Sequence, residues 1–136
     1  MKKKNVLDSF ALVCFFHKEP GWQRISKLFY ELASSNERAV LNIVNWGEFY
    51  YVVRRRVGKR KADEALVLLD QLPVDVLGTD RGLVKDAAEI KADFPVSYAD
   101  AFCVATARRV EGRILTNDRE FEAVQHLVPV IWLAAK

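Results

Sequence analysis

The stretch KNVLDSFALVCFF, residues 4–16, predicts the first unit of the fold. Its first four residues are typical of a short buried strand. Ser9 is a suitable start for a helix that continues through apolar residues to the end of the stretch. Asp8 lies between the two and is the only charged residue between Lys4 and Lys18. The sequence therefore places one acid at the carboxyl end of an apolar strand.

The same pattern of strand and helix repeats along the chain. Further short, nearly continuously apolar strands are predicted at residues 39–43, 74–77, 113–115 and 130–133. One or two helices are expected between successive strands, over residues 20–33, 46–56 (capped by Asn45), 61–72, 80–92, 98–110 and 118–124. Apolar strands of this kind are typical of a parallel sheet that is covered on both faces. We predict a single domain over residues 1–136, a three-layer α/β/α sandwich with a mostly parallel sheet.

The composition favours a folded, cytoplasmic protein. Hydrophobic residues make up 51% of the 136 residues and charged residues 29%, which argues against disorder. The net charge of +3 permits nucleic-acid binding without arguing strongly for it. Lysines at 2–4 precede an apolar stretch, but Asp8 interrupts it and no small-residue cleavage site follows, so we expect neither a secretion signal nor a membrane span. Cys14 and Cys103 are expected to be buried, reduced thiols.

Two further acids lie in uncharged surroundings. Glu48 is the only charged residue in the stretch 39–53, and Asp100 is the only one in the stretch 94–107. Ionised carboxylates are rarely buried without a partner, because their desolvation is unfavourable. Together with Asp8, these acids indicate a shared site whose cation comes from outside the chain.

The predicted topology brings a fourth acid to the same place. Asp118 falls just beyond the fourth strand, within Thr116-Asn117-Asp118. Ligand sites in open parallel sheets form at the carboxyl ends of the strands, where Asp8 also lies. Glu48 and Asp100 come near the starts of helices that can point an acid toward this edge.

Four converging carboxylates would repel one another unless a cation lay between them. An all-oxygen site without a nearby histidine or cysteine favours Mg²⁺ or Mn²⁺ over Zn²⁺. His17 and His126 have no partner at a zinc-binding or catalytic spacing. A hard divalent ion beside phosphate is suited to phosphoester hydrolysis, because it activates water and stabilises the leaving oxygen.

These acids lie in segments that, in this order, resemble the PIN domain. The segments are Val6-Leu7-Asp8-Ser9, Asn45-Trp46-Gly47-Glu48, Tyr98-Ala99-Asp100-Ala101 and Leu115-Thr116-Asn117-Asp118, with Phe121. The length and helix-rich layout look most like the VapC-type toxins of toxin–antitoxin modules. The resemblance implies an Mg²⁺- or Mn²⁺-dependent endoribonuclease acting on RNA. It also implies a homodimer, or a hetero-oligomer with a cognate antitoxin that covers the site.

The resemblance also implies roles for individual residues. Metal ligands, direct or through water, would be the catalytic acids Asp8, Glu48, Asp100 and Asp118. Ser9 and Thr116 would be supporting hydroxyls, and Asn117 matches the motif without a clear role. Two features depart from the family pattern: Phe10 is bulky, and Glu122 lies one helical turn after Asp118, where it could replace or assist that ligand.

Each acid also has a purely structural interpretation. Asp8 and Asp118 could cap helices, Glu48 could be a first-turn acid, and Asp100 could form a capping box with Ser97. These roles do not exclude metal binding.

The basic residues allow two interpretations as well. The run from Arg54 and Arg55 through Lys61 could bind RNA phosphates, but it is better explained as a solvated helix end. Arg81, near the predicted carboxyl edge, is a further weak candidate for substrate contact.

Two other functions are compatible with acids at the carboxyl edge of a parallel sheet. A phosphatase of the haloacid-dehalogenase type has an Asp-x-Asp motif after its first strand, but here Phe10 takes the place of the second aspartate. A phosphate-receiver domain has a paired acid before the first strand's aspartate and a lysine near its end, and this sequence has neither at the expected position. A catalytically inactive RNA-binding or partner-binding module on the same fold remains an alternative, although the complete set of acids argues against it.

Overall fold

The computed structural model describes residues 3–134; the ends of the predicted domain, residues 1–2 and 135–136, lie outside the described residues. Over this range the strands are β1 (Asn5–Leu7), β2 (Ala39–Asn42), β3 (Val74–Leu77), β4 (Arg113–Thr116) and β5 (Val130–Trp132). The helices are α1 (Ser9–Phe16), α2 (Trp22–Ser34), α3 (Ile43–Val57), α4 (Lys59–Leu69), α5 (Arg81–Asp93), α6 (Tyr98–Arg109) and the 3₁₀ helix η1 (Arg119–Val124).

The described strands form one sheet in the order β3-β2-β1-β4-β5, and every neighbouring pair is parallel. The central strand β1 pairs on one side with β2, where Val6 lies opposite Val40, and on the other side with β4, where Val6 lies opposite Ile114. The predicted parallel sheet of short apolar strands is therefore confirmed.

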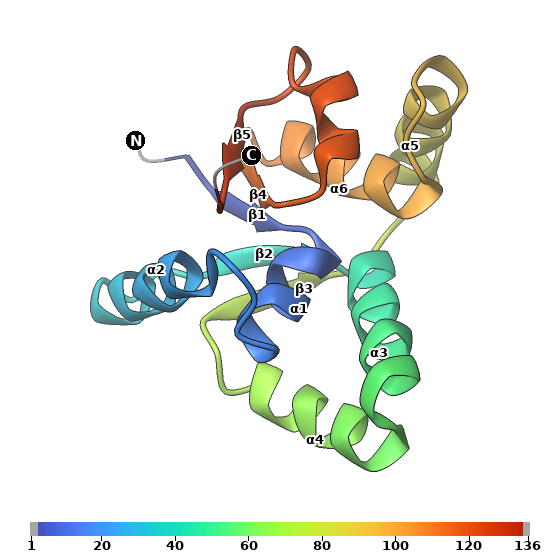
Figure 1. The fold of residues 1–136 in the computed structure, drawn as a ribbon. Helices are drawn as coiled ribbons and strands as arrows, with labels where there is room; N and C mark the ends of the chain where they lie inside the picture. The colour runs from blue at the N-terminus through green and yellow to red at the C-terminus, as the bar shows by residue number, and fades with distance from the viewer. Residues whose placement is uncertain (1–2, 135–136) are drawn as a thin grey trace.

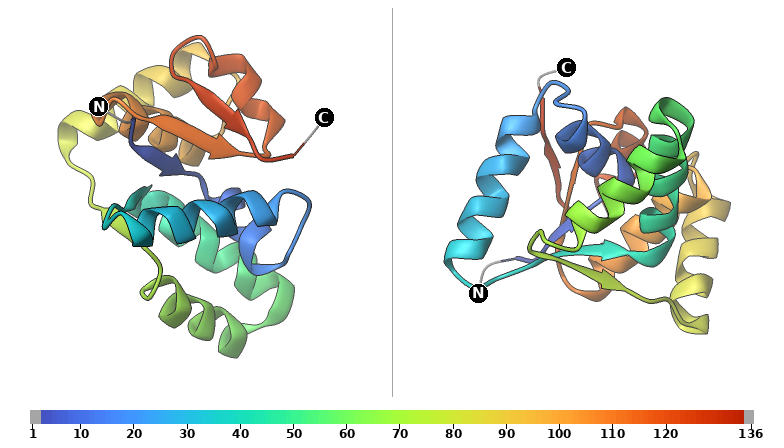
Figure 2. Two further views of the ribbon diagram at one scale, coloured as in Figure 1. Left: turned by 90° about the vertical axis from the view of Figure 1, so that its left-hand side faces the viewer. Right: turned by 90° about the horizontal axis from the view of Figure 1, so that it is seen from below.

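Alternate residues of the strands pack into two separate cores. Leu7 and Leu115 belong to a core formed with α1, α2, α3 and α4. Val6 and Ile114 belong to a second core, formed with α5, α6 and η1 on the other face. Figures 1 and 2 show these two groups of helices on opposite sides of the sheet. The molecule is a three-layer α/β/α sandwich, as the uninterrupted apolar strands predict.

The start of α3 differs from the prediction. The expected cap, Asn45, lies inside the helix and is fully buried. The actual cap is Asn42, whose Oδ1 accepts a hydrogen bond from Val44 N at 2.8 Å. Its Nδ2 donates to Thr106 Oγ1 at 3.0 Å, so contact with α6 decides which of the two asparagines begins the helix.

Other helix ends differ by smaller amounts. The fourth helix spans Lys59–Leu69 rather than residues 61–72, since the chain after Leu69 turns toward β3 through a hydrogen bond from Gln71 N to Leu68 O. The segment 119–124 forms a 3₁₀ helix that is capped by Asp118. These shifts of one to three residues occur where a helix frays into a turn.

None of the described helices is long and apolar enough to cross a membrane. The helix α3, for example, has 15 residues and ends in three arginines. A membrane-spanning helix needs about 20 mostly apolar residues.

The buried side chain of Asn42 provides a test of the fold. Asn42→Ala removes both the cap of α3 and the hydrogen bond to Thr106, and each contributes about 1 kcal/mol, so we expect a loss of about 2 kcal/mol in the free energy of unfolding. Urea denaturation measures it.

Asp80→Ala serves as the control, because Asp80 caps α5 through Leu83 N but is exposed to solvent. The control should lose less stability than Asn42→Ala. Asp80→Ala also removes an exposed ion pair with Arg109, and exposed pairs contribute little to stability. Equal losses in the two variants would show that the buried contact with Thr106 contributes no more than this exposed pair.

Candidate metal centre

Three acids from separate parts of the chain meet at the carboxyl edge of the sheet. Asp8 directly follows β1, Asp118 lies two residues beyond β4, and Asp100 is in the first turn of α6. One carboxylate oxygen from each lies within 4.8 Å of the others. Among the described residues Glu122 is not part of this group, and its side chain is exposed. The geometry therefore favours Asp118 over Glu122 as the fourth-motif acid.

Asp8 is held from two sides. Its Oδ1 accepts a hydrogen bond from Ala11 N at 2.8 Å, which makes it the cap of α1. Its Oδ2 accepts from Thr116 Oγ1 at 2.6 Å, and the same hydroxyl accepts from Asp118 N at 2.9 Å. Thr116 therefore links two of the acids, and the capping role predicted for Asp8 coexists with its place in the centre.

Asp100 is positioned by the start of α6. Ser97 caps this helix and accepts a hydrogen bond from Asp100 N at 3.1 Å. The preceding residue, Ala99, accepts a bond from Asn45 Nδ2 at 3.0 Å, which holds α3 against α6. The sequence suggests only a capping role for Asn45. The signal for its contact with α6 is its position in an uncharged stretch, one helical turn before Glu48.

Glu48 lies beside the group of three rather than within it. Ser9 Oγ donates a hydrogen bond to Glu48 Oε1, and Tyr51 Oη donates to Oε2 at 3.5 Å. Ser9 is fully buried and Glu48 is half-buried. The supporting hydroxyl predicted at Ser9 therefore orients the carboxylate that α3 contributes.

The electrostatics of the centre are dominated by burial. Burial raises the pKa of Asp8 to about 7, although hydrogen bonds from Thr116 and Ala11 act in the opposite direction. Burial also raises the pKa of Asp100 to about 8, and the charges of Asp118, Asp8 and Glu48 raise it further. Both acids therefore lie where a proton or a cation is strongly favoured.

The donor set suits a hard divalent cation. Asp8 and Asp100 are 0% and 2% exposed. None of the ion pairs between described residues involves either of them, Asp118 or Glu48. Their ligand atoms are all carboxylate oxygens, which Mg²⁺ and Mn²⁺ prefer. These residues could therefore hold such an ion.

Asn117 has a different role from its neighbours in the motif. Its Nδ2 donates to Pro20 O at 2.9 Å, and its Oδ1 accepts from Ala134 N at 2.8 Å. It joins the turn between α1 and α2 to the segment after β5. Asn117 therefore supports the chain around Asp118.

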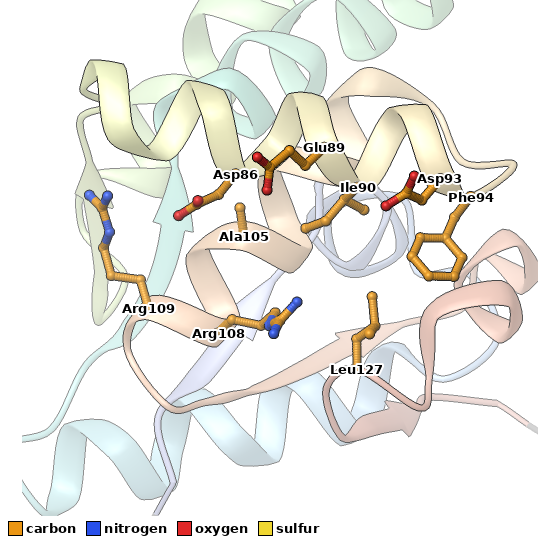
Figure 3. A pocket seen from close by; sticks show the side chains of 9 residues that line it. All are labelled: Asp86, Glu89, Ile90, Asp93, Phe94, Ala105, Arg108, Arg109 and Leu127. Carbon is orange, nitrogen blue, oxygen red and sulfur yellow. The ribbon is translucent and has the colours of Figure 1, made fainter.

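A pocket between α5 and α6 lies apart from these acids (Figure 3). The two arginines at the end of α6, Arg108 and Arg109, and three acids of α5 line it together with apolar side chains. None of the acids of the centre contributes to it. Arg109 forms an ion pair with Asp80 at 2.8 Å. The pocket is therefore a mixed-charge groove on the side of the sandwich, distinct from the centre.

The chain is also similar to known proteins in sequence pattern and in fold. The sequence model of the PIN domain matches residues 6–127, and the chain belongs to that family. The match includes β1 from Val6 onward, the strands β2 to β4 and every acid of the centre. A comparison with curated protein sequences gives no match.

Several solved structures share this fold. VapBC2 from Rickettsia felis, solved with a DNA fragment of its promoter, has a TM-score of 0.73 and 14% identity over 94% of this chain and 97% of that chain. DNA-bound VapBC from Salmonella typhimurium has a TM-score of 0.72 and 19% identity over 98% and 100%. VapC20 from Mycobacterium tuberculosis, described as a sarcin-ricin loop cleaving toxin, has a TM-score of 0.70 and 19% identity over 89% and 95%. At these identities the comparison shows a common fold.

The raised pKa values predict how stability depends on pH. In the folded, metal-free chain Asp8 and Asp100 bind protons up to about pH 7 and 8, whereas in the unfolded chain they lose them near 3.8. The folded state therefore holds more protons in this range, and the free energy of unfolding should fall as the pH rises from about 4 to 8. Thermal unfolding in chelator at pH 5 and pH 8 measures it.

Added Mn²⁺ should raise the melting temperature more at pH 8 than at pH 5, because protons compete for the same oxygens. Asp100→Asn should reduce both effects. If the metal-free protein instead became more stable as the pH rises from 5 to 8, and Asp100→Asn removed that gain, this account would be wrong.

Thr116 provides a test of how the acids are oriented. Thr116→Val removes the hydroxyl that bonds Asp8 Oδ2 and Asp118 N but keeps the shape of the side chain. Loss of such a supporting bond lowers metal affinity by about 10- to 100-fold. Titration of Mn²⁺ followed by calorimetry measures it.

The matched control is Thr106→Val, because the Thr106 hydroxyl is also buried but bonds Asn42 and Phe102 O instead of an acid. This variant should lose stability and keep its Mn²⁺ affinity. If both valine variants bind Mn²⁺ like the wild type, Thr116 has no part in orienting the centre.

Proposed function

We propose that this chain is a metal-dependent endoribonuclease that hydrolyses phosphodiester bonds of RNA, and that it is the toxin of a toxin–antitoxin pair. The observation that carries the proposal is the convergence of the Asp8, Asp100 and Asp118 carboxylates within 4.8 Å, with Asp8 and Asp100 buried. No ion pair between described residues involves any of the three. Membership of the PIN family and the likeness to VapC20, a cleaving toxin, support it.

Mg²⁺ or Mn²⁺ is the cofactor that we propose for the centre, held by Asp8, Asp100 and Asp118. Such an ion supplies positive charge to a substrate phosphate and makes water a better nucleophile. The chain's own residues keep the carboxylates in place: Thr116 fixes Asp8, and the capped start of α6 fixes Asp100.

Glu48 is proposed as a fourth catalytic acid that acts through water. It is not one of the three acids that converge, so it would contact the ion through a water molecule rather than directly. The hydrogen bond from Ser9 fixes one oxygen, and Tyr51 approaches the other. In this arrangement Glu48 can accept a proton from the attacking water.

We further propose that a cognate antitoxin protein inhibits the enzyme by covering the centre. The solved relatives from Rickettsia felis and Salmonella typhimurium are VapBC assemblies, which supports a partner of this kind. A homodimer, or a hetero-oligomer with the antitoxin, and a cytoplasmic location belong to the same proposal.

Cleavage of RNA tests the function directly. The purified chain should cleave a mixed RNA pool with Mg²⁺ or Mn²⁺, and chelator should stop it. Asp8→Asn and Asp100→Asn should reduce cleavage to the level seen with chelator, because each removes a negative ligand from a centre built on charge. Gel analysis of labelled RNA measures the products.

The control pair is Asp118→Asn against Glu122→Gln. Only the first should abolish cleavage, because Asp118 belongs to the converging group and Glu122 does not. Cleavage that persists in chelator would refute the metal mechanism. A well-folded wild type that binds Mn²⁺ but cleaves no RNA would instead favour an inactive binding module.

A further inference from the structure

A row of three side chains leads away from the acidic centre along one face of α3. Glu48, Tyr51 and Arg55 are three and four residues apart, which places them on the same side of a helix. Tyr51 Oη lies 3.5 Å from Glu48 Oε2. The guanidinium of Arg55 lies over the Tyr51 ring, 5.0 Å from its centroid. A carboxylate, an aromatic ring and a cation therefore follow one another from the centre outward.

The ring of Tyr51 is not part of either core. Tyr51 is 45% exposed, although a large aromatic side chain normally gains most when it is buried. Its pKa is raised by partial burial and by the charge of Glu48, and the charge of Asp100 adds to this. Tyr51 is thus a neutral, exposed ring within the electrostatic range of two acids of the centre.

The basic run beside this row divides into paired and unpaired residues. Arg56 pairs with Glu19 at 3.0 Å, Lys59 with Asp63 at 2.6 Å, and Arg60 with Glu64 at 3.6 Å. By contrast, none of the ion pairs between described residues involves Arg54 or Arg55. Much of the run therefore neutralises acids of the protein itself, and the cation next to Tyr51 does not.

An exposed ring beside an unpaired arginine suits single-stranded nucleic acid. Every base has a face that can stack on an aromatic ring, and arginine binds phosphate oxygens. The acids of the centre repel a polyanion, so cations close by are needed to hold one against them. The row supplies both groups one and two helical turns from Glu48.

We propose that Tyr51 and Arg55 form a subsite for single-stranded RNA, in which Tyr51 stacks on a base next to the cleaved bond and Arg55 binds a neighbouring phosphate. This proposal rests on the ribonuclease function proposed above. Stacking of this kind accepts any base, so the subsite contributes affinity and position rather than sequence preference.

Binding of a fluorescently labelled, unstructured RNA oligonucleotide in chelator, followed by anisotropy, tests the subsite. Tyr51→Ala and Arg55→Ala should each weaken binding about tenfold. Tyr51→Phe should bind within about twofold of the wild type, because it keeps the ring. Arg55→Ala should also lower the slope of log Kd against log salt by about one.

The matched controls are Tyr30→Ala, on α2 and 76% exposed, and Arg60→Ala, on α4; both should bind RNA like the wild type. Circular dichroism and Mn²⁺ affinity establish that each variant is folded with an intact centre.

Three results would overturn the proposal. If Tyr51→Phe binds as weakly as Tyr51→Ala, the hydroxyl matters and Tyr51 only positions Glu48. If the wild type cleaves RNA, and Tyr51→Ala and Arg55→Ala bind RNA as tightly as it does, the subsite is refuted and the ribonuclease function stands. A loss of antitoxin binding in the same two variants would then assign this face of α3 to the protein partner. If the wild type neither binds nor cleaves RNA, both proposals fail.

Discussion

The burial of carboxyl groups at one edge of the sheet is the constraint on which the arrangement of this molecule depends. Asp8 and Asp100 are almost completely inaccessible, and Asp118 adds its charge at short range. Burying such groups is unfavourable unless hydrogen bonds, protons or a cation compensate. Hydrogen bonds from Ala11 and Thr116 offset part of the cost of burying Asp8. A cation bound between the acids would offset the rest.

Helix starts provide a second, weaker compensation. Asp8 and Asp118 cap α1 and η1, and Asp100 lies in the first turn of α6. The amino-terminal end of a helix carries partial positive charge, which favours a nearby carboxylate by a few tenths of a kcal/mol to about 1 kcal/mol. The structural interpretation of each acid and its place in the centre are therefore two aspects of one arrangement.

Features that depend on local pattern were predictable, and those that depend on distant contacts were not. Apolar runs ending in Asp8 and Thr116 indicated both the parallel sheet and the edge at which the acids meet. The cap of α3 was misplaced because Asn42 and Asn45 are equally suitable by residue type, and the bond to Thr106, 64 residues away, decides between them. The hydrogen bonds of Asn117 to Pro20 and Ala134 join segments that are far apart in the sequence, so no local motif predicts them.

The central strand pair also governs when the centre can exist during synthesis. β1 pairs with β4, so Asn5 comes to lie opposite Arg113, and Asp8 gains the Thr116 hydroxyl only across that pair. A nascent chain in which β4 has not yet been synthesised contains Asp8 and Glu48. It lacks Asp118 and the hydrogen bond from Thr116 that orients Asp8. Contacts so distant in sequence form late. The three-acid centre therefore cannot be assembled until the chain through Asp118 has left the ribosome, and a nascent chain shorter than that lacks it.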